Sequence, residues 1–297
     1  MLFVGQESTY SQAAKGLKKL LHSAADPKQS ERLVHAYGPE VGQAVEDHLD
    51  QTLPTAKEAE HNYVMFDGAM ILTREKGYKE VKLGRIFAAS DHLPENHSRN
   101  WIRDSLYIGC LGSQSDFFKK IEPAVDRLKN PVFINDGAQC IWAWIDQYHP
   151  QSTQILDYYH ATEYLHKFAQ EQFTELLLRE KWVEDQKKSL LENEIELVIA
   201  DIEALKHRTK KANEEKKKVL TYYRNNTKRM KYKTYTEQGL MIGSGPIEAA
   251  HKTGIQERLK KSGQRWKIEG ANAVIQLRTA NKSEKWNLVV DTIKVAA

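Results

Sequence analysis

Three acidic residues stand next to segments that the sequence predicts to be strands or a helix. Asp67 follows the apolar run Tyr-Val-Met-Phe, Asp136 follows Val-Phe-Ile-Asn, and each precedes Gly-Ala. Glu248 follows a Gly-Ser-Gly-Pro sequence, which predicts a tight turn and then a helix, because Pro246 suits the first helical position. Carboxylate oxygens are the ligands that Mg²⁺ prefers, so these acids form a candidate divalent-metal site.

Such a site is typical of phosphoryl transfer. Two metal ions about 3.5–4 Å apart can activate an attacking oxygen and stabilise the leaving oxygen of a phosphodiester. Each acid also has a purely structural interpretation. An Asp-Gly pair commonly forms a turn, and a glutamate in the first turn of a helix is favoured by the helix dipole.

A further pair, Asp157 and His160, follows the segment Gln-Ile-Leu. One interpretation is a hydrogen-bonded structural couple. The other is a pair that supports the metal ligands or contacts DNA beside them. We expect Glu248 to be the third ligand, and Asp157 and His160 to position the site without ligating the metal.

Basic residues gather in two segments. Residues 206–233 hold twelve Lys or Arg against two acids, whereas residues 179–205 hold four basic and eight acidic residues. Basic side chains neutralise phosphates and the interleaved tyrosines can stack on unpaired bases, although a solvated helical surface is the alternative. The candidate DNA-binding residues are Lys216, Lys217 and Lys218 in this segment and Lys252, Arg258, Lys260, Lys261 and Arg265 after Glu248.

The composition is that of an ordinary globular protein of 297 residues with a net charge of +4. Cys110 and Cys140 form no zinc-binding pattern, and both lie in apolar runs where we expect buried, reduced thiols. The first residues do not resemble a signal peptide, and no apolar run approaches the roughly 20 residues of a membrane helix. We therefore expect a cytoplasmic protein with no membrane partner.

Residues 1–60 are expected to form a helical region. Apolar residues at helical spacing cover 11–21, Asp26-Pro27 predicts the start of a second helix, and Gly38-Pro39 predicts its end. A third helix is expected from Pro39 to about Asp50. Two short helices around a tight connection fit either a DNA-reading helix-turn-helix or an ordinary helical hairpin.

From His61 the pattern changes to that of a sheet with helices. The expected strands are 63–66, 79–89, 106–111, 132–135 and one that begins at 154–156. One expected helix is capped by Ser113 or Ser115 and runs to about Leu128, and a short one covers 140–148. The order of three strands, helix, strand, helix and strand predicts an α/β fold, with a mixed sheet flanked by helices.

Residues 161–238 contain no Gly or Pro and carry apolar residues at helical spacing, which predicts an all-helical insertion. The expected organisation is therefore a helical N-terminal region (1–60), the first part of an α/β core (61–160), the helical insertion (161–238) and the second part of the core (239–297).

In combination these motifs resemble the DDE transposases of bacterial insertion sequences, of the ISKra type. The resemblance spans about residues 1–290, with the motifs in the family order: Asp67-Gly-Ala, Lys79-Glu-Val-Lys-Leu, Asp136-Gly-Ala-x-x-Ile-Trp, Gln154-Ile-Leu-Asp-Tyr-Tyr-His-Ala, Gly239-Leu-Met-Ile-Gly-Ser-Gly-Pro-Ile-Glu-Ala-Ala and Arg258-Leu-Lys-Lys-Ser-Gly-Gln-Arg-Trp. It implies an RNase H-like core with a helical insertion between the second aspartate and the glutamate.

The resemblance also implies an activity. Asp67, Asp136 and Glu248 match the catalytic triad, which binds two Mg²⁺ or Mn²⁺ ions. Asp157 and His160 match an Asp/Cys-x-x-His signature of many such enzymes. The implied partners are transposon-end and target DNA, with a homo-oligomer assembled on DNA and a nucleoid-associated location in bacteria.

Family members usually carry a longer N-terminal region, so the chain is expected to begin partway into it, and this puts recognition of specific DNA ends in doubt. Two other functions stay open. One is an RNase H-like nuclease without strand transfer, and the other is a catalytically idle, transposase-derived DNA-binding protein.

Overall fold

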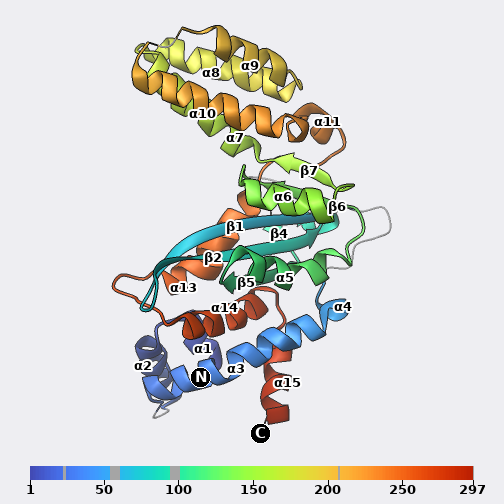
Figure 1. Ribbon diagram of the computed structural model, residues 1–297. Helices are drawn as coiled ribbons and strands as arrows, with labels where there is room; N and C mark the ends of the chain where they lie inside the picture. Colours follow the sequence, from blue (N-terminus) through green and yellow to red (C-terminus); the bar gives the residue numbers. More distant parts are fainter. Residues whose placement is uncertain (23–24, 54–60, 94–100, 207, 297) are drawn as a thin grey trace. The chain divides into compact units, whose positions relative to one another are not determined.

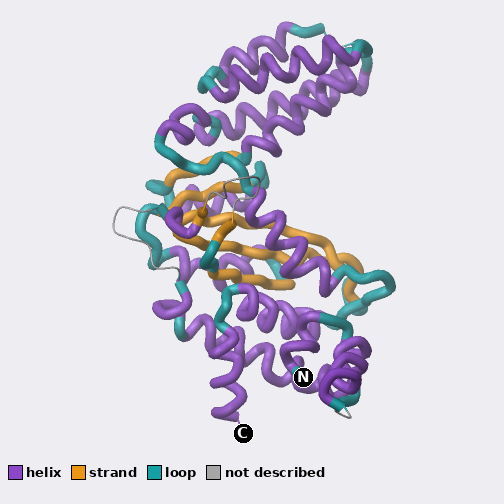
Figure 2. Tube along the Cα trace, turned by 180° about the vertical axis from the view of Figure 1, so that it is seen from behind, coloured by secondary structure: helices purple, strands orange, loops and turns teal. Residues whose placement is uncertain are grey.

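The computed structural model describes residues 1–22, 25–53, 61–93, 101–206 and 208–296 (Figure 1). The chain divides into two compact units: unit 1 is Met1–Pro131 with Gly245–Ala297, and unit 2 is Val132–Ser244. The expected fold class is confirmed. The protein is α/β, and Figure 2 shows its helices and strands. Unit 1 contains antiparallel strands, unit 2 contains parallel strands, and both contain helices.

Unit 1 contains an antiparallel sheet in the order β5–β2–β1. Its strands are β1 (Asn62–Thr73), β2 (Gly77–Ala88) and β5 (Leu106–Leu111), and a separate short pair consists of β3 (His92–Leu93) and β4 (Trp101–Ile102). The turn between β1 and β2 ends at Gly77, whose φ of +64° is a conformation that favours glycine.

Strand β1 is longer than the sequence predicted. Its expected end was Phe66, but β1 pairs with β2 as far as Thr73, so Asp67 lies inside the strand and its expected place at a strand end is wrong. Beyond Asp67 the burial alternates, with Ala69 and Ile71 buried and Met70 exposed. The glycine at position 68 suggested a turn, but it occupies an exposed position of a regular strand.

Helices cover both faces of this sheet. The helical elements of unit 1 are α1 (Leu2–Glu7), α2 (Tyr10–Leu21), α3 (Pro27–Asp47), α4 (Leu49–Thr52), the 3-10 turn η1 (Ala89–Asp91), α5 (Gln114–Val125), α12 (Gly245–His251), the π-helical turn η3 (Lys252–Gln256), α13 (Glu257–Leu259), α14 (Ile268–Lys282) and α15 (Trp286–Ala296). A Cβ at Gly84 would lie 2.2 Å from Ile121 of α5, and one at Gly109 would lie 2.6 Å from Ile275 of α14. Glycines therefore let helices pack closely on the two faces.

Helix α3 continues through the predicted stop at Gly38-Pro39, and the expected third helix is its second half. A Cβ at position 38 would lie 2.6 Å from the backbone of Ala273 in α14, and one at Gly42 would lie 2.8 Å from the Gln276 side chain. The two glycines, one helical turn apart, allow α3 to approach α14 closely. The Gly-Pro pair thus marks a helix contact instead of a helix end.

Unit 2 combines two parallel strands with helices. Strand β6 (Pro131–Asn135) pairs with β7 (Thr153–Leu156), and the helical elements are α6 (Gln139–Tyr148), α7 (Tyr158–Gln172), α8 (Leu176–Leu191), α9 (Ile195–Ala204), α10 (Lys210–Asn226), the 3-10 turn η2 (Thr227–Arg229) and α11 (Tyr232–Glu237). Every described element from α7 to α11 is helical, in agreement with the expected all-helical insertion.

The cysteines differ from one another in their environments. Cys110 is buried, as expected. Cys140 is exposed near the start of α6 and is not among the residues that this helix buries, so its expected burial is wrong. Among the described residues, no helix has the length and the apolar character needed to cross a membrane.

Candidate functional site

Asp67 sits in the middle of the unit 1 hairpin. Its Oδ1 accepts a hydrogen bond from the amide of Gly68 at 2.7 Å, and its strand partner is Leu83. Gly68 points to the opposite face, where a Cβ would lie 2.4 Å from the carboxylate of Glu80, which pairs with Lys82 at 2.8 Å. Glycine after Asp67 therefore leaves room for an ion pair on the other face of the sheet.

Arg85 fixes the start of α12, the helix that carries Glu248. This arginine is only 8% exposed, and it donates from Nη1 to the carbonyl of Pro246 at 2.9 Å and from Nε to Ser105 Oγ at 3.0 Å. Burial lowers the pKa of Arg85, an effect that the nearby Tyr107 opposes. The first residues of α12 are thus tied to strand β2.

The other end of α12 is tied to the same strand. His251 lies 3.2 Å from the carbonyl of Val81 through its Nε2 atom. Helix α12 therefore follows β2 from Arg85 to Val81, and Glu248 lies between these two anchors. Leu83, midway between them, is the strand partner of Asp67, so α12 runs along the part of β2 that pairs with Asp67.

In unit 2, Asp136 and Asp157 follow adjacent parallel strands. Asn135 pairs with Leu156, and the amide of Asp157 donates to the carbonyl of Asn135 at 2.9 Å, which continues the ladder by one residue. Both acids therefore stand at the carboxyl edge of the β6–β7 pair. Asp136 is exposed, and its Oδ1 accepts a hydrogen bond from the amide of Ala138 at 3.0 Å, so the Asp-Gly turn that the sequence allowed is present.

Asp157 is fully buried, and its carboxylate joins the start of α7 to the turn that contains Ser244. Its Oδ1 accepts from the amide of His160 at 2.8 Å, which caps α7, and its Oδ2 accepts from the amide of Ser244. The His160 ring lies 3.6 Å from the same carboxylate through Nδ1. Burial raises the pKa of Asp157, but the hydrogen bonds from His160 and Ser244 outweigh it, and the net pKa lies below the usual value.

The hydrogen bond from Ser244 to Asp157 fixes the turn that leads to Glu248. Besides the Ser244 contact, the amide of Tyr158 donates to the carbonyl of Ile242 at 2.9 Å. A Cβ at Gly243 would lie 2.6 Å from the ring of Tyr159. The Gly-Ser-Gly turn is therefore held by the end of β7 and the start of α7, and glycine is needed where the Tyr159 ring packs.

Tyr222 of α10 packs directly on the residue after Asp136. A Cβ at Gly137 would lie 2.0 Å from the Tyr222 ring, which also stacks on Tyr164 with ring centroids 3.9 Å apart. Burial raises the pKa of Tyr222, and the nearby Tyr164 and Asp136 raise it further. These rings line a cavity of about 780 Å³ in unit 2 that also includes Lys217, Lys218, Trp142 and Arg229.

The three candidate lysines of α10 have different roles. Lys216 donates to the carbonyls of Glu203 and Leu205 at 2.8 and 2.7 Å, so it caps the end of α9. Lys218 pairs with Glu215 at 2.6 Å, and Lys217 is exposed at the cavity. Lys217 and Lys218 thus remain candidate phosphate contacts, while Lys216 is a structural contact within unit 2.

The basic run after Glu248 is also divided. Lys252, Lys260 and Arg265 are exposed and Lys261 is half-buried. Arg258 is only 1% exposed, because its guanidinium lies inside unit 1 and donates to the carbonyl of Gly5. It is therefore not part of an open basic surface.

Sequence reasoning did not single out Arg85 or Tyr164. An arginine at an inward position of an alternating strand was a signal for Arg85, because a buried cation needs partners. The contact between Tyr164 and Tyr222 joins residues far apart in the sequence, and no local pattern indicates it.

Comparisons with known proteins identify a family. A profile described as "Uncharacterised protein family (UPF0236)" matches residues 5–289. The chain is 26% identical over 232 residues to "UPF0236 protein in vanSb 3'region" of Streptococcus gallolyticus, an alignment that covers 74% of this chain and 49% of that protein. The chain thus spans about half the length of this curated relative.

Proposed function

The chain belongs to the uncharacterised protein family UPF0236, and we propose that it is a DDE-type DNA transposase that cleaves and joins DNA strands by metal-dependent phosphoryl transfer. The observation that carries the proposal is the placement of the acids. In unit 1, the helix that carries Glu248 runs along the part of β2 that pairs with Asp67, and in unit 2 Asp136 stands at the carboxyl edge of the parallel strands.

The order of elements supports an RNase H-like core. Three antiparallel strands are followed by a helix, a parallel strand, a helix and a second parallel strand. The first acid lies on the first strand, the second follows the first parallel strand, and the third lies on a helix after the helical insertion. This order is the one that the resemblance to DDE transposases implies.

The three acids suit Mg²⁺ or Mn²⁺. They offer hard oxygen ligands, and each reaches solvent, since Asp136 and Glu248 are exposed and Asp67 is half-buried. Ligand positions therefore remain for water and phosphate oxygens. Catalysis in this proposal needs all three carboxylates.

The chain itself contributes mostly positioning, as phosphoryl transfer requires. Bound metal ions would supply Lewis-acid activation of the attacking oxygen and charge stabilisation at the leaving oxygen. Arg85 holds the helix of Glu248, and Asp157 holds the turn before it. The nucleophile is water in cleavage and a DNA 3′-hydroxyl in joining, and the DNA partners are the element ends and a target, bound by an oligomer of the protein in the bacterial nucleoid.

A DNA cleavage and joining assay tests the proposal. End-labelled duplexes from the flanks of the coding sequence are incubated with the protein and Mg²⁺, Mn²⁺ or EDTA. The proposal expects metal-dependent nicks and joined products. Nicks without joining favour the nuclease alternative, and binding without nicks in either metal favours an idle DNA-binding protein.

A further inference from the structure

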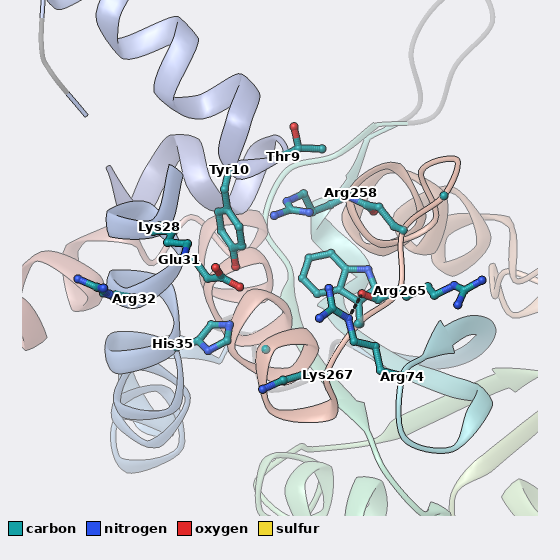
Figure 3. A pocket seen from close by; sticks show the side chains of 14 residues that line it. Thr9, Tyr10, Lys28, Glu31, Arg32, His35, Arg74, Arg258, Arg265 and Lys267 are labelled. Carbon is teal, nitrogen blue, oxygen red and sulfur yellow. Dashed lines mark hydrogen bonds between the residues drawn. The ribbon is translucent and has the colours of Figure 1, made fainter. Parts of the chain in front are cut away.

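Unit 1 contains a strongly basic cavity of about 780 Å³ (Figure 3). It is lined by α2, α3, the end of β1, the segment 258–267 and the start of α14. Among the described residues that line it, Glu31 is the one acid. The cationic side chains are Lys28, Arg32, Arg74, Arg258, Arg265 and Lys267.

Arg258 provides a buried donor in this cavity. Its Nε and Nη2 atoms donate to the carbonyl of Gly5 at 3.3 and 3.2 Å, and its guanidinium lies 5.1 Å from the ring of Tyr10 and 4.8 Å from that of Trp266. Within the described residues, Nη1 has no hydrogen-bond partner, although Arg258 is only 1% exposed. An unpaired buried guanidinium nitrogen is costly, so the cavity is suited to an anion.

Tyr10 adds a second donor to the wall. Its hydroxyl is buried and lacks a partner among the described residues. Burial raises the pKa of Tyr10 to about 12, although Arg258 opposes the increase. The hydroxyl therefore stays protonated at neutral pH and able to donate.

Exposed residues of α3 and of the start of α14 form the outer edge of the cavity, which we call the rim. Lys28, Arg32 and His35 are spaced by four and three residues, so they share one face of α3. A Cβ at Gly270 would lie 2.7 Å from His35 Nε2, so glycine lets this face approach α14. The N-cap residue Lys267 gives no side-chain acceptor to the first amides of α14, whose positive dipole end adds to the basic field.

Hydrogen bonds to the backbone hold together the segments that carry the remaining cations, Arg74, Arg265 and Lys267. The amide of Trp266 donates to Leu72 at 3.0 Å, and the amide of Arg74 donates to Trp266 at 2.8 Å. Arg74 also donates from Nε to the carbonyl of Arg265 at 3.2 Å. The segment that carries Arg265 and Lys267 is thus attached to the end of β1.

We propose that this cavity binds a terminal phosphate group. A phosphate inside a strand has two free oxygens and a nucleotide on either side, whereas a phosphate monoester presents three oxygens at the end of a molecule and enters a recess more easily. A monoester can therefore reach the recessed Nη1 of Arg258 while the rim cations contact its outer part. Two sources share this chemistry: the 5′-phosphorylated end of a nucleic-acid strand and a free nucleotide.

The assignment to a strand end rests on the proposed function, but the phosphate site does not. The test is fluorescence anisotropy in EDTA, with an oligothymidylate that carries either a 5′-phosphate or a 5′-hydroxyl. The variant Arg32→Gln with Lys267→Gln removes two exposed rim cations. The control, Lys18→Gln with Lys19→Gln, removes the same charge from exposed positions of α2 outside the cavity. A further variant, Arg258→Gln, removes the buried guanidinium and so tests the inner part of the cavity.

The proposal expects the 5′-phosphorylated strand to bind about tenfold more tightly than the hydroxyl strand. The rim variant and Arg258→Gln should lose this preference, and the control should keep it. No preference in the unmodified protein, or an equal loss in the control, would overturn the proposal.

Competition with thymidine 5′-monophosphate separates the two sources. If the site binds strand ends, thymidine 5′-monophosphate should displace the labelled strand only at much higher concentrations than the unlabelled phosphorylated strand does. Equal potency of the two competitors would overturn the assignment to strand ends in favour of a free nucleotide. Because no metal is present, the result is independent of DNA cleavage. A protein that keeps the phosphate preference but never cleaves DNA would refute the proposed function alone.

Discussion

At the scale of single residues, Asp157 differs from the acids of the proposed site in its burial. Both carboxylate oxygens of Asp157 accept from backbone amides, those of His160 and Ser244. The residue is fully buried, whereas Asp136 and Glu248 are exposed. Asp157 is therefore suited to hold a turn.

The variant Asp157→Asn should keep part of the DNA cleavage. We expect a loss of about 10–100-fold with Mn²⁺, typical of residues that support metal ligands. Rates of nicking with Mn²⁺ measure this, and His160→Ala should fall in the same range. Complete loss of cleavage in a folded Asp157→Asn protein would contradict the positioning role.

Asp157 should also contribute to acid stability. Its folded-state pKa is lowered, so its contribution is fully present above the unfolded-state pKa of about 3.9 and is lost as the pH falls through the folded-state value. Asparagine can accept only one of the two amide hydrogen bonds and leaves a buried donor unpaired, at a cost of about 1–3 kcal/mol.

Urea unfolding of the parent and of Asp157→Asn between pH 3 and pH 7 measures this effect. The difference in the free energy of unfolding should be constant near neutral pH and should shrink below about pH 4. A difference that grows on acidification would show that the carboxylate is not stabilised in the folded protein.

At the scale of elements, local sequence patterns predicted whether a segment is a helix or a strand better than they predicted where it ends. Strand β5 matches the sequence analysis, and of the two serines expected to cap α5 the structure uses Ser113. The two errors in element ends, at Asp67 and at Gly38-Pro39, have one cause. Glycine suggested a break, but in each case it makes room for atoms distant in sequence: Glu80 near Gly68, and Ala273 near Gly38.

The candidate site was predictable only in part for the same reason. The sequence indicated which acids to examine, because their Gly-containing contexts are local. It did not indicate that Arg85 fixes α12, that Asp157 binds the amide of Ser244 or that Arg258 is buried under Tyr10. These contacts join residues separated by many positions, and one sequence contains no local signal for them.

The contact between α3 and α14 gives a prediction with an internal control. Gly38→Ala should destabilise unit 1 by about 1–3 kcal/mol, because a Cβ would lie 2.6 Å from the Ala273 backbone. Gly16→Ala in α2 meets no atom within 4 Å and should stabilise by about 0.5–1 kcal/mol. Urea unfolding of both variants measures the two effects. Equal effects would show that α3 does not pack closely on α14.

Helix α10 gives a prediction about DNA affinity. Lys217→Gln with Lys218→Gln should weaken binding to all DNA sequences alike. It should also reduce the slope of log Kd against log salt concentration by the amount expected for about two phosphate contacts. Lys216 is left intact because it caps α9. The matched control is Lys187→Gln with Lys188→Gln on α8, whose lysines pair with acids one turn away. An unchanged slope in the α10 variant would identify its lysines as solvated surface.

At the scale of the whole molecule, the account depends on three carboxylates that come from distant parts of the chain. Asp67 lies on the first strand, Asp136 follows β6 and Glu248 lies on α12, after the helical segment of unit 2. The proposed chemistry needs oxygens from all three, because the metal ions they hold must stabilise both the attacking and the leaving oxygen.

The most direct test is the DNA nicking rate of three single variants, Asp67→Asn, Asp136→Asn and Glu248→Gln, measured with Mg²⁺ and Mn²⁺. The controls are Glu75→Gln in unit 1 and Asp185→Asn in unit 2, both exposed acids outside the proposed site. The account predicts that each of the three variants loses nicking by more than about 1,000-fold, well beyond the 10–100-fold typical of supporting residues, while both controls keep the parental rate. Parental nicking by any one of the three folded variants would contradict it.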